Sequence, residues 1–132
     1  MTAPTPYIFF PGTCREALEH YRAVFGGELE LHTYGEFGRT DGPADDIAHG
    51  DLLGPVSLQG ADAGADEDPV ALTGVMLSLL GRSDAATLHR WFDALAEGGT
   101  IVSPLERRSW GDWDGIVVDA HGLRWLIGYR GA

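Results

Sequence analysis

The chain has 132 residues, of which 44% are hydrophobic, so it is long enough to bury the core of one compact domain spanning residues 1–132. Its formal net charge of −11 disfavours nucleic acid and anionic membrane surfaces as partners, because both are themselves negatively charged. No apolar run approaches the roughly 20 residues that span a bilayer, and the N-terminus lacks the basic-then-apolar pattern of a secretory signal. One cysteine excludes an internal disulfide and suits a reducing compartment, so we expect a cytoplasmic protein.

The first half of the chain predicts a strand followed by an amphipathic helix. The aromatic and β-branched run PYIFF, residues 6–10, indicates the strand, and PGT then interrupts it. Thr13, with Glu16 three residues later, has the pattern of a capping box at the start of the helix. Gly26-Gly27 ends the helix, because glycine tolerates the left-handed conformation found there. The apolar residues at helical spacing are Ala17, Leu18, Tyr21, Val24 and Phe25.

Three more strands complete this half. The runs with strand character are 28–34, 47–53 and 56–61. The last two predict a hairpin joined through Gly54-Pro55. The Gly-rich segment 35–46 is either a mobile flap over a cleft or a plain loop, and residues 62–69 have the composition of an exposed linker.

The second half repeats this order. GVMLSLL, residues 74–80, predicts a strand, and Ser83 is the expected N-cap of a second helix. Gly98-Gly99 ends that helix. Its apolar stripe, which we assign to the core, is Leu88, Trp91, Phe92 and Leu95. Strands are then predicted at 100–105, 113–118 and 124–129.

Both halves therefore contain a strand, a helix, a Gly-Gly pair and three strands, and VFGGELEL and LAEGGTIV occupy the same place in each. We interpret this as an internal duplication of a βαβββ unit, with module one at about 5–62 and module two at about 73–130. The predicted fold class is α+β, in which the two tandem modules form a curled mixed sheet around a cleft, with the helices outside. Such a cleft is a common place for a small-molecule site.

A duplicated βαβββ module of this length resembles the vicinal oxygen chelate superfamily, which includes glyoxalase I, bleomycin-resistance proteins and extradiol dioxygenases. The stretches that carry the resemblance look most like its PhnB-like branch. They are PYIFFPGTCREALEHYRAVFGGEL, HGDLLGPVSLQGAD and SWGDWDGIVVDAHGLRWLI. The resemblance implies the fold and a homodimer but no particular reaction, since one fold hosts many functions.

In metal-dependent members of that superfamily, four His or Glu ligands come from the inner strands. A cation that chelates two substrate oxygens needs such N and O donors together with open coordination positions. Aligned without gaps, the corresponding positions of this chain are Thr5, Ser57, Val75 and Leu126. Val75 and Leu126 have no donor atom, and neutral hydroxyls bind divalent cations poorly. We therefore expect no metal at that site, and no cofactor.

Two polar pairs and the cysteine are candidate reactive groups, and none is assigned a catalytic role. His49 and Asp51 share a strand face, so Asp51 could orient His49 as a general base. We favour a structural or partly exposed pair instead, because the predicted hairpin register turns both side chains away from the cleft. For His32 and Tyr34, ordinary solvent-facing alternation is likewise favoured over a place in the cleft. Cys14 lacks a visible base and is more simply a small residue at the helix start.

Aromatic side chains supply the predicted binding site, because aromatic walls bind planar or cationic ligands by stacking and by cation–π attraction. The predicted ligand-binding residues are Tyr7, Phe9, Ser57, Gln59, Trp110, Trp113 and Trp125. Trp110 and Trp113 lie in the polar stretch SWGDWDG and are the better cleft candidates. Trp125 suits core packing and cleft lining equally.

Two functions from different classes remain open. The first, which we predict, is a metal-free protein that binds a small aromatic or cationic molecule, as bleomycin-resistance proteins bind theirs. The second is a glyoxalase-like lyase or isomerase, or a dioxygenase, with a displaced metal site formed by His49, Asp51 and His32. A structural or regulatory dimer without a small ligand is a third alternative.

Overall fold

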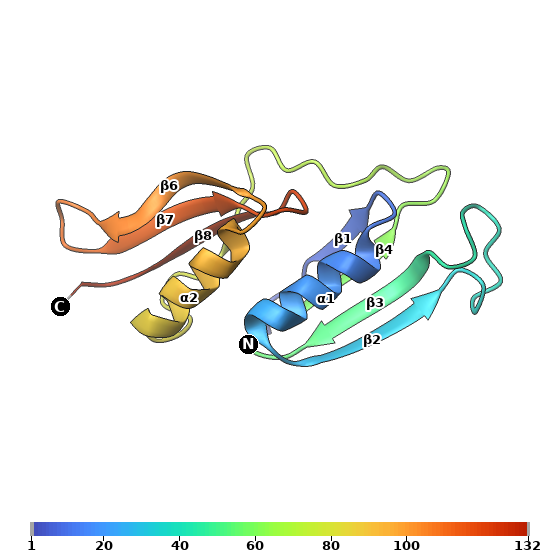
Figure 1. The fold of residues 1–132 in the computed structure, drawn as a ribbon, viewed down its shortest axis with the longest axis horizontal. Coiled ribbons are helices and arrows are strands. Elements are labelled where there is room, and N and C mark those ends of the chain that lie inside the picture. Colours follow the sequence, from blue (N-terminus) through green and yellow to red (C-terminus); the bar gives the residue numbers. More distant parts are fainter. Residues whose placement is uncertain (1, 132) are drawn as a thin grey trace. The chain divides into compact units, whose positions relative to one another are not determined.

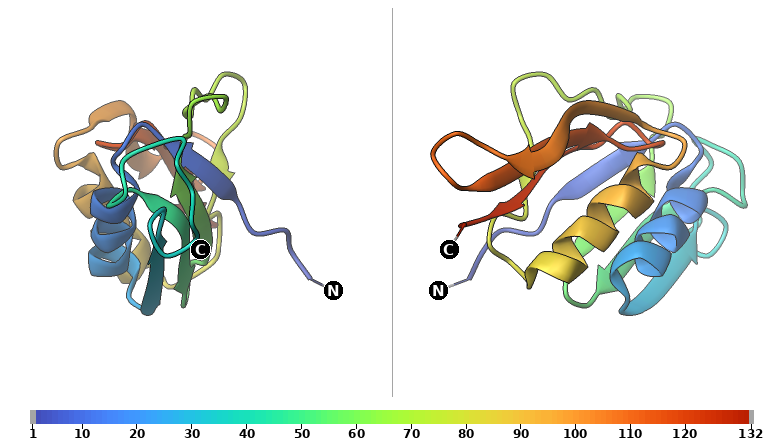
Figure 2. Two further views of the ribbon diagram at one scale, coloured as in Figure 1. Left: turned by 90° about the vertical axis from the view of Figure 1, so that its right-hand side faces the viewer. Right: turned by 60° about the vertical axis from the view of Figure 1, so that its left-hand side comes forward.

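Each half of the chain folds into a four-stranded mixed sheet with one helix lying across one face (Figure 1; Figure 2 gives two further views). The computed structural model describes residues 2–131, and the chain divides into two compact units, residues 1–70 and 71–132. The predicted α+β class and the two tandem βαβββ modules are confirmed. No helix within residues 2–131 is long and apolar enough to cross a membrane.

In unit 1 the strands lie in the order β1-β4-β3-β2. β1 pairs with β4 in parallel, and the other pairs are antiparallel. The predicted hairpin is therefore confirmed as β3 and β4. The elements of this unit are β1 (Tyr7–Phe10), α1 (Cys14–Phe25), β2 (Glu28–Thr33), β3 (Ile47–Leu53) and β4 (Leu58–Asp62).

Unit 2 has the same topology, with strand order β5-β8-β7-β6 and β5 parallel to β8. The identical order supports the duplication inferred from the sequence. The predicted strand 74–80 is reduced to two residues, and Gly74, at φ 73°, turns the chain just before it. The elements are β5 (Leu77–Ser78), α2 (Ala85–Ala96), β6 (Thr100–Arg107), β7 (Trp113–Val118) and β8 (Arg124–Tyr129).

α1 begins after Thr13 as predicted but lacks the predicted capping contact, and the N-cap of α2 differs from the predicted one by one residue. The Thr13 side chain makes no capping bond, so the capping box is wrong; the backbone N–H of Cys14 instead donates to the Asp62 carboxylate at 2.8 Å. Asp62 lies at the end of β4, and a buried carboxylate is a stronger acceptor than a hydroxyl. In α2 the N-cap is Asp84 rather than Ser83, and its carboxylate accepts from Thr87 N–H at 2.8 Å.

The two Gly-Gly pairs perform the same task in each unit. Gly26 and Gly98 adopt φ values of 83° and 72°, which only glycine takes without strain. A side chain on Gly27 would collide with the backbone oxygen of Leu53, and one on Gly99 with that of Val118. The pairs therefore end the helices and let the chain pass close to the neighbouring strand.

The cores follow the predicted periodicity except at Val24, which is only half-buried. α1 buries Cys14, Ala17, Leu18, Tyr21 and Phe25, and α2 buries Leu88, Trp91, Phe92 and Leu95. The assignment of Trp91 to the core is confirmed. Burial and the nearby Asp62 raise the pKa of the Cys14 thiol to about 12, so this cysteine is not a thiolate at neutral pH.

The segment after β2 revises one expectation and favours one of the two alternatives left open for the Gly-rich loop. A bulge between His32 and Thr33 ends the strand alternation, so Tyr34 is fully buried rather than facing solvent, and its hydroxyl donates to the Asp62 backbone oxygen at 2.6 Å. The Gly-rich loop is fastened by Arg39, which pairs with Asp41 at 2.6 Å and with Glu67 at 3.3 Å and lies over the Tyr34 ring. These contacts favour the plain loop over the flap.

Candidate functional site

The sheet of unit 1 has one face packed on α1 and an opposite face, here called the open face of unit 1. Directly paired residues of neighbouring strands point to the same side of a sheet. Tyr7 pairs with Gln59, Gln59 with Asp51, and Asp51 with Glu30, so these side chains form one row across the four strands of the open face.

This register overturns the expectation that His49 and Asp51 point away from the predicted ligand residues. A two-residue Gly54-Pro55 turn would pair Asp51 with Leu58, whereas the structure pairs Asp51 with Gln59. One extra residue in the turn shifts the pairing by one position, and such a shift moves every side chain to the other face. Asp51 and His49, two residues apart on β3, therefore share a face with Tyr7 and Gln59.

Tyr7 and His49 are in direct contact on this face. The Tyr7 hydroxyl lies 3.1 Å from His49 Nδ1, and the two rings stack with centroids 5.7 Å apart. Phe9 packs beside Tyr7 at 5.6 Å. Burial, the largest cause, raises the pKa of Tyr7, and the Glu67 carboxylate adds to the effect, so the Tyr7 hydroxyl is protonated at neutral pH and can donate to His49.

His32, at the edge strand β2, is held by carboxylates rather than by the other histidine. Its Nε2 lies 2.8 Å from Glu30 and its Nδ1 lies 3.0 Å from Glu36. These hydrogen bonds, first to Glu30 and then to Glu36, raise the pKa of His32. Both ring nitrogens are thus already engaged.

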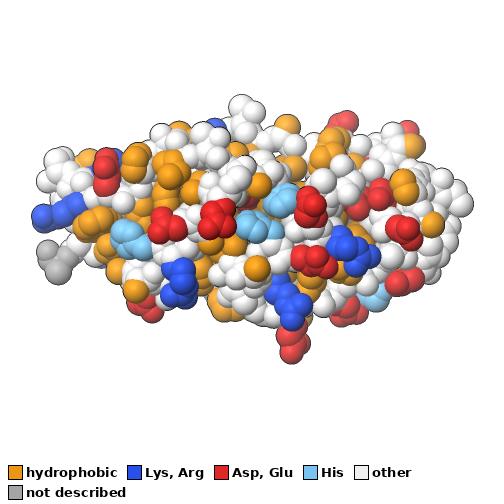
Figure 3. All heavy atoms as spheres, in the orientation of Figure 1, with side chains coloured by type: hydrophobic (Ala, Val, Ile, Leu, Met, Phe, Trp, Pro, Cys, Tyr) orange, Lys and Arg blue, Asp and Glu red, His pale blue; other side chains and the backbone are white. Residues whose placement is uncertain are grey.

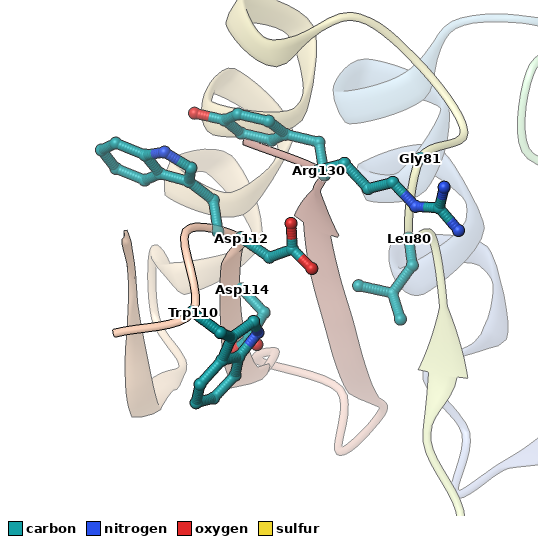
Figure 4. Close-up of a pocket in the computed structure, with 8 residues that line it drawn as sticks. Leu80, Gly81, Trp110, Asp112, Asp114 and Arg130 are labelled. Carbon is teal, nitrogen blue, oxygen red and sulfur yellow. The ribbon is translucent and has the colours of Figure 1, made fainter. Parts of the chain in front are cut away.

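Unit 2 contains a pocket of about 360 Å³, here called the unit 2 pocket, where β8 ends, β7 begins and the chain leaves β5 (Figure 4). Its volume falls in the lower part of the range of small-molecule sites. It is lined by Leu80, Gly81, Trp110, Asp112, Trp113, Asp114, Tyr129 and Arg130.

Three aromatic side chains form much of the pocket wall. Trp113 and Tyr129 are paired across β7 and β8, and their rings stack at 5.7 Å with only 11° between the planes. His89 of α2 meets the Trp113 ring edge-on at 5.4 Å and hydrogen-bonds the Tyr129 hydroxyl at 2.9 Å. Trp110 is 68% exposed. The pocket thus contains the predicted Trp110 and Trp113, and it adds Tyr129. Pairing the predicted strands 113–118 and 124–129 as an antiparallel hairpin would have put Tyr129 opposite Trp113.

The charges around this pocket nearly balance. Asp114 is paired with Arg108, whose Nε lies 2.9 Å from the carboxylate. Asp112 accepts a hydrogen bond from Gly131 N–H at 3.1 Å. Arg130 also lines the pocket and has no ion pair within residues 2–131. Elsewhere, acidic side chains are dispersed over the surface, as on the face shown in Figure 3.

The remaining predicted residues lie elsewhere. Tyr7, Phe9 and Gln59 belong to the open face of unit 1, and Ser57 lies just before β4 with its hydroxyl 3.5 Å from the Gly54 backbone oxygen. Trp125 is 1% exposed, and its indole N–H donates to Asp119 at 2.8 Å. Trp125 is not among the residues that line the unit 2 pocket, so it forms no part of the proposed site.

The residues at the superfamily's metal positions do not fit a divalent cation. Thr5, Ser57 and Val75 precede strands β1, β4 and β5, and Leu126 lies within β8. Within the strands themselves, Tyr7 of β1 pairs with Gln59 of β4, and Ser78 of β5 pairs with Leu126 of β8. Neither pair offers an imidazole or a carboxylate. Within the described part of the chain, no three His, Cys, Asp or Glu side chains gather closely enough to hold a metal ion.

Comparison with known proteins agrees with this architecture. The family model of the glyoxalase/bleomycin resistance protein/dioxygenase superfamily matches residues 6–127. The crystal structure of protein PA1353 from Pseudomonas aeruginosa is 31% identical, with a TM-score of 0.80 over 98% of both chains. Protein YjdN of Escherichia coli is 27% identical over 140 residues, which cover 93% of this chain and 92% of YjdN. A PhnB protein from Bacillus cereus, described as a putative 3-demethylubiquinone-9 3-methyltransferase, has a TM-score of 0.79 over 97% of this chain and 99% of its own. At 19% identity it indicates a shared fold alone.

Proposed function

Since the chain belongs to the glyoxalase/bleomycin resistance protein/dioxygenase superfamily, whose members share a fold rather than one reaction, we propose that it binds a small aromatic molecule in the unit 2 pocket without a metal ion. The observation that carries the proposal is the pocket wall itself: Trp110, Trp113 and Tyr129 are among the residues that line a space of about 360 Å³. As further parts of the proposal, the protein is a cytoplasmic homodimer, and size-exclusion chromatography with light scattering checks the dimer.

The rings are arranged to receive a planar ligand. Trp113 is fixed by Tyr129 on one side and by His89 on another, so it loses little freedom when a ligand stacks against it. Trp110 remains largely exposed and can supply a second wall. Each aromatic contact of this kind contributes about 0.5–1.5 kcal/mol beyond the buried area.

The net charge of the whole protein, rather than the charges next to the pocket, decides which charge of planar ligand is favoured. The local charges of Asp112, Asp114, Arg108 and Arg130 nearly cancel. The net charge of −11 then favours a cationic ligand over an anionic one. Indole faces add cation–π attraction to the same preference.

The metal-dependent alternative finds less support in the residues present. Of its three candidate ligands, His32 has both ring nitrogens hydrogen-bonded to Glu30 and Glu36. Freeing that imidazole would break both contacts. Binding without a metal therefore accounts better for the donors that the chain offers.

Isothermal titration with three related probes tests the proposal: the N-methylquinolinium cation, neutral quinoline and the quinoline-2-carboxylate anion. We expect the cation to bind most tightly and the anion least. Trp110→Ala should weaken binding about threefold to tenfold, the equivalent of one lost stacking contact. Phe37→Ala, which removes an exposed aromatic side chain from unit 1, is the matched control and should leave the affinity unchanged. Absence of binding by all three probes, or equal losses in the two variants, would contradict the proposal.

A further inference from the structure

The open face of unit 1 holds a carboxylate oxygen that is buried but has no partner. Asp51 Oδ1 makes no hydrogen bond with any residue of the described chain. Almost all buried polar atoms in native proteins are hydrogen-bonded, because an unpartnered one loses its hydration without replacement. The chain itself therefore leaves Asp51 Oδ1 available as an acceptor for a donor from outside it.

The neighbours of Asp51 define what such a donor must look like. Glu30, opposite Asp51 on β2, is already paired with His32 at 2.8 Å. Gln59, opposite Asp51 on β4, contributes a half-buried neutral amide. Asp51 therefore remains as the acceptor for a positively charged group, and opposite charge with direct hydrogen bonding is the strong form of this contact.

Aromatic surface lies next to this acceptor. Tyr7, 43% exposed, follows Gln59 in the same row, and its ring stacks on His49 and packs beside Phe9. The Tyr7 hydroxyl is occupied by His49, so the ring offers its face rather than its polar end. A ring face beside a carboxylate suits a compact cation that carries an apolar group.

We infer that the open face of unit 1 binds a small primary amine, whose ammonium group donates a hydrogen bond to Asp51 and whose apolar part packs on Tyr7. The site consists of unit 1 residues alone and is independent of the unit 2 pocket. It requires N–H donors and not only positive charge, because the unpartnered group is a hydrogen-bond acceptor.

Three probes that share the phenethyl group test this inference: phenethylamine, phenethyltrimethylammonium, which keeps the charge but has no N–H, and neutral 2-phenylethanol. Binding is followed by ¹H–¹⁵N NMR, with the Gln59 side-chain amide reporting on unit 1 and the Trp110 and Trp113 indoles reporting on unit 2. We expect phenethylamine to shift the Gln59 signal and to bind at least tenfold more tightly than the other two.

Variants separate binding from folding. Asp51→Asn should weaken phenethylamine at least tenfold while the thermal unfolding midpoint stays constant or rises, since an unsatisfied charge has been removed. Glu28→Gln makes the same charge change at an exposed position of β2 and should leave the affinity within twofold. Equal binding of the trimethylated probe, or full affinity in Asp51→Asn, would overturn the inference. Chemical-shift changes confined to the Trp110 and Trp113 indoles would also overturn the inference, but they would be consistent with binding in the unit 2 pocket.

Discussion

Asp62 ties three separate segments of unit 1 together, so its removal is expected to unfold that unit readily. One carboxylate oxygen accepts from Cys14 N–H and the other from Ile47 N–H, both at 2.8 Å, and the side chain is 2% exposed. A hydrogen bond to a charged group contributes about 1.5–3 kcal/mol, so Asp62→Ala should lower the free energy of unfolding by about 3–6 kcal/mol. Asp62→Asn keeps one acceptor oxygen and should lose roughly half of that.

Urea unfolding followed by circular dichroism measures the loss. With a typical dependence of about 2 kcal/mol per molar urea, the midpoint of unit 1 should fall by roughly 2 M in Asp62→Ala. Amide exchange at Cys14 and Ile47 should accelerate together, since both N–H groups lose the same acceptor. Thr13→Ala is the control, because Thr13 makes no side-chain cap, and it should stay within about 0.5 kcal/mol of the parent protein. A loss below about 1 kcal/mol in Asp62→Ala, or an equal loss in Thr13→Ala, would refute this reasoning.

Three further outcomes are expected. Asp84→Ala removes the cap on Thr87 N–H and should lower the melting temperature at pH 7. Because that hydrogen bond lowers the pKa of Asp84, the difference in melting temperature from wild type should shrink as acid protonates the carboxyl. A difference that persists at pH 2 would argue against this capping role. His32→Gln removes a group whose pKa is raised by Glu30 and Glu36. The variant should therefore be less stable than wild type by the full amount below about pH 6.5, and the difference should disappear as pH rises through the folded-state pKa of His32. Scanning calorimetry across pH measures this difference, and a pH-independent one would contradict the assignment. Untagged protein analysed by mass spectrometry of its elements should carry far less than one transition-metal ion per chain, whereas a stoichiometric metal would revive the metal-dependent alternative.

The sequence by itself determined the elements and their order. Helical spacing at Leu88, Trp91, Phe92 and Leu95 identified the face of α2 that is buried, because a 3.6-residue period permits no other stripe. The two Gly-Gly pairs marked the helix ends, since a left-handed backbone and close strand contact both exclude a side chain. These local rules suffice to infer the duplicated βαβββ module, whereas the superfamily was indicated by the resemblance of three longer stretches of sequence.

Only the tertiary structure decided which side chains meet. A single extra residue in the turn before β4 placed Asp51 and His49 beside Tyr7 and Gln59, and the local sequence does not encode that pairing. The start of α1 is capped by Asp62, 48 residues beyond Cys14, which local pattern cannot foresee. Periodicity is a property of neighbours along the chain, whereas a binding face is set by register between strands, and register depends on loop length and packing that act across the whole unit.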